Sequence, residues 1–301
     1  MIRLNSTYIY FLAIKKIFIR SLKEFFFSSN YYNKLLDTEV PSSFLFNPNP
    51  YLLSPFVSHN SSLIKISNEN VRNFRINLFK NKEKNIHNFL WLNLIDRKNK
   101  NIIVQRIIKE WIAKYSKYTK GIWDEDLTSL RIISWISNAD LILNTNDKDF
   151  NKSFYKNTIR QINFIKKNIN NLNDENKKIS SISLLILSGL VFKEYFTYYK
   201  TGLKELKKFI DNYFDASGFP INRNFENLLT FVQYFILIKE CTKDAQLLTP
   251  DFLDEIIVYC KAGVRSREAC EILHSMGYQK LNNLQGGMMR WQSEKMPTLL
   301  E

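Results

Sequence analysis

The residues with the clearest capacity for chemistry surround one cysteine near the C-terminus. Residues 256–259 (Ile-Ile-Val-Tyr) form a short β-branched apolar run, which is typical of a buried parallel strand. Cys260 follows this run directly, and a helical pattern begins at Arg267. A loop between a strand and a helix N-terminus turns backbone N–H groups inward, so it can hold an anion. The same amides stabilise a thiolate, and we therefore predict that Cys260 is a catalytic nucleophile with a lowered pKa.

The residues after the cysteine suit such a loop. Gly263 permits a positive φ angle in a tight turn. Arg265, the second predicted catalytic residue, either faces the bound anion or braces the loop. Ser266 is a natural N-cap for the following helix, and Lys261 adds positive charge at the rim. These residue types together predict a small anion-binding loop.

The length of the loop selects between two chemistries. From Cys260 to Arg265 is six residues, which sizes the loop for a sulfur atom. The longer Cys-x5-Arg loop of tyrosine phosphatases holds a tetrahedral phosphate, so phosphatase activity is disfavoured. The other two cysteines, Cys241 and Cys270, complete no disulfide framework, and Cys270 is interpreted as a core residue rather than a resolving thiol. Such cysteine usage indicates a reducing compartment, and we expect a cytoplasmic location.

Residues 256–297 resemble the second half of a rhodanese (sulfurtransferase) domain. The resemblance is carried by Val258-Tyr259-Cys260-x2-Gly263-x-Arg265-Ser266, then Ala269, Ile272-Leu273, Gly277-Tyr278 and Leu284-x-Gly286-Gly287-x3-Trp291. It implies that Cys260 takes sulfane sulfur from a donor such as thiosulfate, as a persulfide, and passes it to a thiol or to cyanide. It also implies that the loop binds the substrate through Lys261, Ala262, Gly263, Val264 and Ser266. The parallel strands that precede the active-site strand in a whole rhodanese domain have no counterpart here.

The composition changes near Val258. The chain of 301 residues has 8 Gly and 7 Pro, about 5% of the total, where an average protein has roughly 12%. So few turn-forming residues disfavour an all-β sandwich or a Gly-rich nucleotide fold and favour long helices. All 23 Phe residues precede Val258, whereas four of the 8 Gly and four of the 5 Met follow it. This change predicts that two sequences of different origin are joined there, and we expect truncation of two genes into one reading frame.

The larger part of the chain has the pattern of successive helices. Apolar residues recur at helical spacing over 104–115, 127–139 and 155–169, and further helices are expected at about 179–200, 203–214 and 224–241. Short polar connections make consecutive helices antiparallel, as in an α/α layered solenoid or toroid. The expected fold class is therefore mainly α, with a toroid-like helical domain followed by a small α/β piece containing parallel strands.

Residues 70–255 resemble the N-terminal helical domain of heparinase II/III-like polysaccharide lyases. The motifs are Phe89-Leu90-Trp91, Trp111, Trp123-x5-Ser129-x-Arg131-x3-Trp135, and Asp215-Ala216-Ser217-Gly218 followed by Asn222-Arg223-Asn224. The resemblance implies an acidic polysaccharide as partner, with Trp123, Arg131, Trp135 and Arg223 as candidate contacts. Arg131 and Trp135 are also i, i+4 on one helix and can simply pack against each other.

Lyase activity is not expected from this part of the chain. A lyase needs a base, commonly His or Tyr, that takes the proton next to a uronate carboxylate. The chain has His59, His87 and His274, and none of them lies in the 218–223 segment where relatives often carry one. The β-sandwich that completes such lyases is also missing.

Residues 1–69 are expected to be a loop-rich segment with a basic amphipathic helix. The helix covers 8–27 and either lies on a membrane surface or packs on its own domain. No apolar run reaches the roughly 20 residues that cross a bilayer, so no transmembrane segment is expected. The three expected domains are residues 1–69, 70–255 and 256–301.

The charge and the motifs of the chain limit the classes of binding partner that we expect. The 43 Lys and Arg against 29 Asp and Glu give a formal charge of +14, but the charges are scattered and no nucleic-acid-binding motif is present. We expect no specific nucleic-acid partner, no metal and no cofactor. Two functions stay open. One is a sulfurtransferase half-domain with weak or no activity, whose partners are a sulfane sulfur donor and a thiol acceptor. The other is a non-catalytic helical scaffold that binds an acidic polysaccharide.

Overall fold

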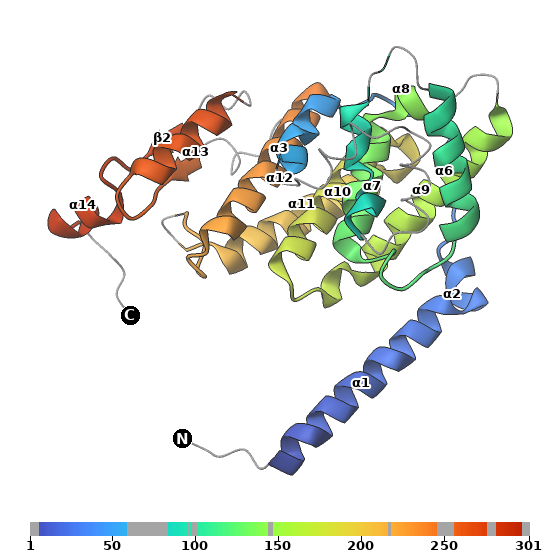
Figure 1. Ribbon diagram of the computed structural model, residues 1–301, viewed down its shortest axis with the longest axis horizontal. Coiled ribbons are helices and arrows are strands. Elements are labelled where there is room, and N and C mark those ends of the chain that lie inside the picture. The colour runs from blue at the N-terminus through green and yellow to red at the C-terminus, as the bar shows by residue number, and fades with distance from the viewer. Residues whose placement is uncertain are drawn as a thin grey trace. The chain divides into compact units, whose positions relative to one another are not determined.

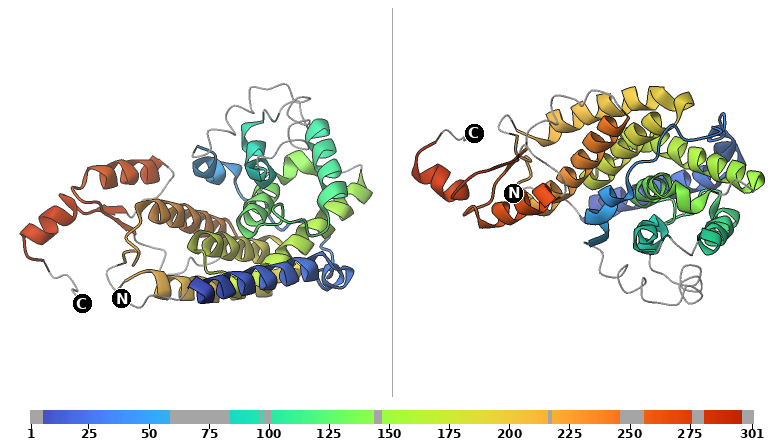
Figure 2. Two further views of the ribbon diagram at one scale, coloured as in Figure 1. Left: turned by 60° about the horizontal axis from the view of Figure 1, so that its bottom comes forward. Right: turned by 90° about the horizontal axis from the view of Figure 1, so that it is seen from above.

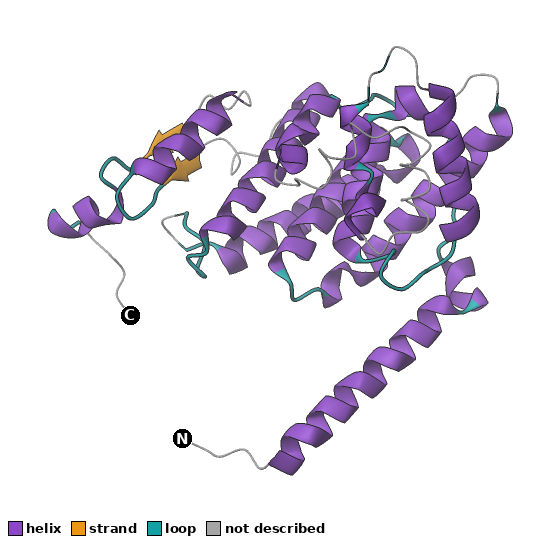
Figure 3. Cartoon of the chain, in the orientation of Figure 1, coloured by secondary structure: helices purple, strands orange, loops and turns teal. Residues whose placement is uncertain are grey.

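The described chain is largely helical. The computed structural model describes residues 6–58, 84–95, 97, 101–143, 147–215, 218–245, 256–275 and 281–296. These residues form helices and one two-stranded parallel sheet near the C-terminus (Figure 1, Figure 3). The expected fold class, mainly α with a small α/β piece, is therefore confirmed.

The chain divides into two compact units, Met1–Leu203 and Lys204–Glu301. The elements of the first unit are α1 (Ser6–Ser28), α2 (Asn30–Leu35), η1 (Pro50–Leu53), α3 (Ser54–Ser58), η2 (Lys84–Asn88), η3 (Leu90–Leu94), α6 (Asn101–Tyr115), α7 (Glu125–Ser137), α8 (Ala139–Ile142), α9 (Lys148–Asn168), η4 (Ile169–Asn171), α10 (Glu175–Val191) and η5 (Lys193–Tyr195). The division falls within α11 (Phe196–Tyr213). The second unit continues with α12 (Phe225–Asp244), β1 (Ile256–Val258), α13 (Val264–Ser275), β2 (Leu281–Asn283) and α14 (Gly287–Ser293).

This division differs from the boundary expected near residue 255. The reason is that α12 shares a core with β1 and α13 and belongs to the second unit. The junction segment 249–255 lies outside the described residues, as do residues 59–69 of the expected loop-rich N-terminal segment.

Aspartate side chains cap the start of three of the long helices of the first unit. Asp124, Asp147 and Asp174 each accept a hydrogen bond from a backbone N–H in the first turn of α7, α9 and α10 respectively. Such caps satisfy amides that have no partner inside the helix. They explain why these helices begin directly after the polar connections in the sequence.

The expectation of one helix over 179–200 is wrong. α10 ends at Val191, Phe192 is extended, and α11 begins at Phe196. Two glycines let the chain pack back closely on itself, because a Cβ on Gly189 would overlap the backbone of Tyr199 and one on Gly202 would overlap Ile186. The long apolar run therefore folds as two helices joined by a tight reversal.

The second unit contains the predicted strand–loop–helix–strand–helix order. β1 pairs in parallel with β2, with Ile256 opposite Leu281 and Val258 opposite Asn283. α13 makes the crossover between the strands, as a parallel pair requires, and α14 follows β2 (Figure 2). The predicted helix-ending Gly277 lies outside the described residues.

One face of α12 supplies the apolar surface that covers this small sheet. Leu228, Val232 and Ile236 are spaced four residues apart, and they are buried together with Val258 of β1 and with Ala269 and Leu273 of α13. This spacing places the three α12 side chains on one side of the helix. The short C-terminal piece therefore shares its core with α12.

Candidate active site

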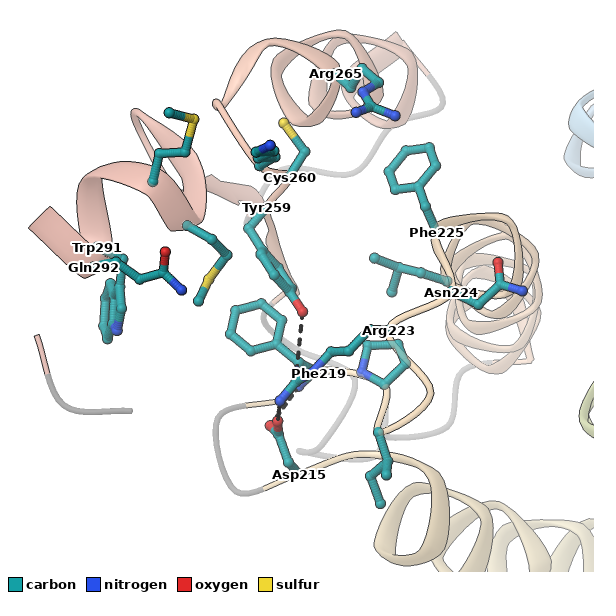
Figure 4. Close-up of a pocket in the computed structure, with 16 residues that line it drawn as sticks. Asp215, Phe219, Arg223, Asn224, Phe225, Tyr259, Cys260, Arg265, Trp291 and Gln292 are labelled. Atoms are coloured by element: carbon teal, nitrogen blue, oxygen red, sulfur yellow. Dashed lines mark hydrogen bonds and ion pairs between the residues drawn. The ribbon is translucent and has the colours of Figure 1, made fainter. Parts of the chain in front are cut away.

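Cys260 lies directly after β1, where the chain turns toward α13 (Figure 4). Its sulfur accepts a hydrogen bond from the backbone N–H of Gly263, with an N–S distance of 3.0 Å. The hydroxyl of Ser266 donates a second one, with an O–S distance of 3.5 Å. The thiol is half-buried, so it remains within reach of a small molecule.

These donors act on the charge state of the thiol. Burial alone would raise the pKa of Cys260, but hydrogen bonds from the Ser266 hydroxyl and from the amides of Ser266, Ala262 and Gly263 outweigh it and lower the pKa to about 7. A thiol with this pKa is substantially ionised near neutral pH. The thiolate is the nucleophilic form of cysteine, so the loop activates Cys260.

Ser266 has a different place from the predicted one. α13 begins at Val264, so Ser266 lies inside its first turn rather than at the N-cap. Its side chain is fully buried and its hydroxyl faces the cysteine sulfur. The residue therefore contacts the reactive group instead of capping the helix.

The start of α14 braces the loop from behind. The backbone N–H of Met288 donates to the carbonyl of Cys260, and that of Met289 donates to the carbonyl of Lys261, both at 2.9 Å. Gly287 allows this approach, because it has a φ of 58° and a Cβ there would overlap the Cys260 carbonyl oxygen. These bonds satisfy the loop carbonyls on the α14 side. The backbone N–H groups of the loop remain available to the Cys260 sulfur.

Gly263 has the positive φ angle that the sequence predicted. Its φ is 83°, and a Cβ would lie 2.7 Å from the backbone nitrogen of Gly286. Glycine is therefore required at this position both by conformation and by space.

The other predicted loop residues are exposed around the cysteine. Lys261, Ala262, Val264 and Arg265 all lie at the surface of the second unit. Arg265 extends from the first turn of α13, and together with Lys261 and Cys260 it lines a cleft of about 930 Å³ (Figure 4). Two cationic side chains therefore border the opening above the thiol.

Aromatic and sulfur-containing side chains form part of the remaining wall of the cleft. They are Phe219, Phe225, Tyr259, Met288, Met289 and Trp291. Phe219 and Phe225 come from the segment around the start of α12, whereas the others belong to the β1 end and to α14. The cleft thus combines an apolar lining with positive charge.

Arg223 lies in this cleft rather than at a separate sugar site. Its guanidinium pairs with the carboxylate of Asp215 at 2.6 Å and donates to the phenolic oxygen of Tyr259 at 3.1 Å. The Asp215 carboxylate also accepts from the Phe219 amide, so it fixes the turn that carries Phe219. Sequence analysis did not predict this arrangement, because Asp215 and Tyr259 are 44 residues apart in the chain and no local pattern links them.

The expected polysaccharide contacts of Trp123, Arg131 and Trp135 do not fit their positions. All three side chains are fully buried in the first unit, so they present no surface to a sugar. The Arg131 guanidinium lies 4.6 Å from the Trp111 ring centroid and donates to Gln161 and Thr128 and to the carbonyl of His87. These residues hold the helices together, and we do not propose a polysaccharide site at them.

The other two cysteines lie in less reactive surroundings. Cys241 is fully buried in α12, and burial raises the pKa of its thiol. Cys270 packs against the shared core of the second unit, and burial raises its thiol pKa as well. Cys260 is therefore the thiol with a lowered pKa among the three.

Comparisons with known proteins find similarity in the C-terminal part of the chain. The Rhodanese-like domain family matches residues 234–294. A protein named Sulfurtransferase from Allochromatium vinosum is 37% identical over 43 residues, which are 14% of this chain and 40% of that protein. Rhodanese-like domain-containing protein 17 from Arabidopsis thaliana is 33% identical over 70 residues, 20% of this chain and 45% of that protein. The chain thus spans less than half the length of each of these two curated relatives, and no solved structure matches it.

Residues 234–294 are thus similar to the Rhodanese-like domain family, and one of these relatives is named a sulfurtransferase. The match begins inside α12, upstream of residue 256 where the sequence resemblance was placed. The part of α12 inside the match includes Ile236, which lies in the core shared with β1 and α13.

Proposed function

We propose that the second unit transfers sulfane sulfur through a persulfide on Cys260. The observation that carries this proposal is the pair of donors on the cysteine sulfur, the Gly263 amide and the Ser266 hydroxyl, at the mouth of a cationic cleft. The same donors that stabilise a thiolate can stabilise the outer sulfur of a persulfide anion.

The reaction has two half-reactions that share the cysteine. In the first, the Cys260 thiolate attacks the outer sulfur of thiosulfate, the sulfur–sulfur bond of thiosulfate breaks, and sulfite leaves with the electron pair. In the second, the thiolate of an acceptor attacks the outer sulfur of the Cys260 persulfide, and the Cys260 thiolate leaves. The acceptor then carries the persulfide, or thiocyanate forms if the acceptor is cyanide.

The cationic residues at the rim have a role in the first half-reaction. Thiosulfate is a dianion, so Lys261 and Arg265 at the cleft favour its approach to a thiolate that would otherwise repel it. Arg223 is already paired with Asp215, and it therefore contributes less free charge than these two.

The packing of α12 supports activity in so short a domain. A two-stranded sheet buries too little surface to be stable by itself. Here Val232 and Ile236 of α12 cover it together with Leu273 of α13. The loop around Cys260 is thereby held on a packed core.

Intact-protein mass spectrometry after incubation with thiosulfate tests the proposal. We expect the full chain to gain the mass of one sulfur atom, to lose it on addition of cyanide, and to gain none in the Cys260→Ser variant. Cys270→Ser serves as the matched control and should still gain the sulfur. Absence of the adduct in the folded wild-type chain, or its retention in Cys260→Ser, would reject the proposal.

A further inference from the structure

Helix α1 exposes a wide apolar face that the sulfur-transfer site does not use. Phe11, Ile14, Phe18, Leu22 and Phe25 follow one another at intervals of three and four residues, which places them on one side of the helix. All five side chains are exposed, and Phe25 keeps 79% of its surface accessible. The exposed apolar surface continues at the flanks of this face with Tyr10, Ile17, Ile19 and Phe26. Such a contiguous apolar surface marks a binding site.

The charges on α1 are almost entirely positive. The helix contains Lys15, Lys16, Arg20 and Lys23, against the single acidic residue Glu24. The spacing of Lys23 from Phe18, Leu22 and Phe25 places it on the side of the helix opposite the apolar face. Glu24 pairs with Lys120 of the same unit at 2.8 Å.

The C-terminal end of α1 is fixed to the first unit. Phe27 packs its ring edge-on against Tyr118 and Phe164, with centroids 5.1 and 5.8 Å apart. Together with the Glu24–Lys120 pair, this contact holds the last turn of α1 while the apolar face stays uncovered. The helix is the blue one that leads into α2 in Figure 1.

We propose that α1 binds in the plane of a membrane that contains anionic lipids. A helix with bulky apolar and aromatic residues on one side and Lys and Arg on the other lies at the boundary between headgroups and acyl chains. The basic residues then interact with anionic headgroups, each adding to the attraction. None of the helices in the described part of the chain is long and apolar enough to cross a bilayer, so α1 lies on the surface instead of spanning it.

The charge of α1 favours a lipid surface over a second copy of this chain. Two α1 helices packed face to face would bring eight positive side chains near each other and only two acidic ones, both already paired with Lys120. An anionic membrane offers the opposite charge to the same residues. The chain's formal charge of +14 adds to this attraction.

Vesicle co-sedimentation with the full-length chain tests this proposal. The probes are vesicles of phosphatidylcholine alone and vesicles of phosphatidylcholine with phosphatidylglycerol. We expect binding to the anionic vesicles, weaker binding at high salt, and at least about tenfold weaker binding for the Ile14→Glu, Phe18→Glu double variant. Because both positions are exposed, circular dichroism should show that this variant keeps its fold.

The matched control changes an exposed isoleucine outside α1. Ile102 of α6 is 80% exposed, and Ile102→Glu should bind the anionic vesicles like the wild type. The proposal would be overturned if Ile102→Glu lost as much vesicle binding as the α1 double variant. It would also be overturned if the wild type bound neutral and anionic vesicles equally, or bound neither. A dimer in sedimentation that Ile14→Glu, Phe18→Glu abolishes, without vesicle binding by the wild type, would also overturn it and assign the face to a second copy.

Discussion

The guanidinium of Arg223 donates a hydrogen bond to the phenolic oxygen of Tyr259 at 3.1 Å. Tyr259 immediately precedes Cys260, whereas Arg223 lies just before α12 and outside the segment that matches the rhodanese-like family. The contact thus ties the turn before α12 to the end of β1. Phe219 and Phe225, on either side of Arg223 in the chain, line the same cleft as Cys260.

Loss of Arg223 should slow sulfur loading without unfolding the protein. In Arg223→Ala, Tyr259 and Asp215 lose a shared partner, and we expect persulfide formation from thiosulfate to slow about two- to fivefold, because partly exposed ion pairs contribute under about 1 kcal/mol. The rate follows from timed mass spectra. Arg106→Ala is the control. It removes a similarly exposed ion pair, with Glu110 on α6, and should leave the rate of persulfide formation unchanged. An unaltered rate in Arg223→Ala would contradict the positioning role.

Gly287 should be intolerant of any side chain. A Cβ at Gly287 would overlap the carbonyl oxygen of Cys260, so Gly287→Ala must push the loop away from α14. We expect the variant to form no measurable persulfide while its helical content is retained. The measurement is the thiosulfate adduct combined with far-ultraviolet circular dichroism.

Gly218 offers the matched control for this change. It also has a positive φ, of 78°, but a Cβ there would meet nothing within 4 Å. Gly218→Ala should therefore cost only backbone strain, about 1 kcal/mol, and should still form the adduct. If both glycine variants lost the adduct equally, strain alone and not the contact with Cys260 would be the cause.

The α12 face should prove essential to the fold of the second unit. Ile236 is buried in the core shared with β1 and α13, and truncation to Ala should lower the free energy of unfolding by about 2–5 kcal/mol. Urea denaturation followed by circular dichroism measures this loss, and the thiosulfate adduct should decline with it. Ile272→Ala on α13 is the control, because Ile272 is 54% exposed and its removal should cost under about 1 kcal/mol. Similar losses for both would show that α12 does not cover the sheet.

The sequence predicted the reactive loop because its determinants are local. A β-branched run, a cysteine, a glycine at a positive φ and a helix follow one another within 20 residues in 256–275, and the structure contains them in that order. Ser266 was predicted to cap α13, but it lies within the first turn of the helix and contacts the Cys260 sulfur. Both roles require a small side chain with a hydroxyl, so the residue type alone could not distinguish them.

The cleft could not be predicted, because the residues that line it opposite Cys260 lie more than 30 positions away from Cys260 in the sequence, between Asp215 and Leu228. Nothing in the local pattern around Arg223 distinguishes a polysaccharide contact from a partner of Tyr259. The same ambiguity affected Arg131 and the tryptophans Trp123 and Trp135, since aromatic and basic residues at helical spacing suit both a sugar site and a core. Only their complete burial separates the two.

The reactivity of Cys260 should depend on pH in a manner set by Ser266. Because the pKa of Cys260 is lowered to about 7, its alkylation by iodoacetamide should reach half its maximal rate near pH 7 and rise as the pH increases above it. Ser266→Ala removes the hydroxyl that donates to the sulfur, so the midpoint should move toward higher pH. Peptide mass spectrometry reports the rate at Cys260 separately from Cys241 and Cys270. Ser293→Ala on α14, whose hydroxyl donates to the carbonyl of Arg290, is the control and should keep the wild-type midpoint. A midpoint that stays the same in Ser266→Ala would mean that the backbone amides of the loop alone activate the thiol.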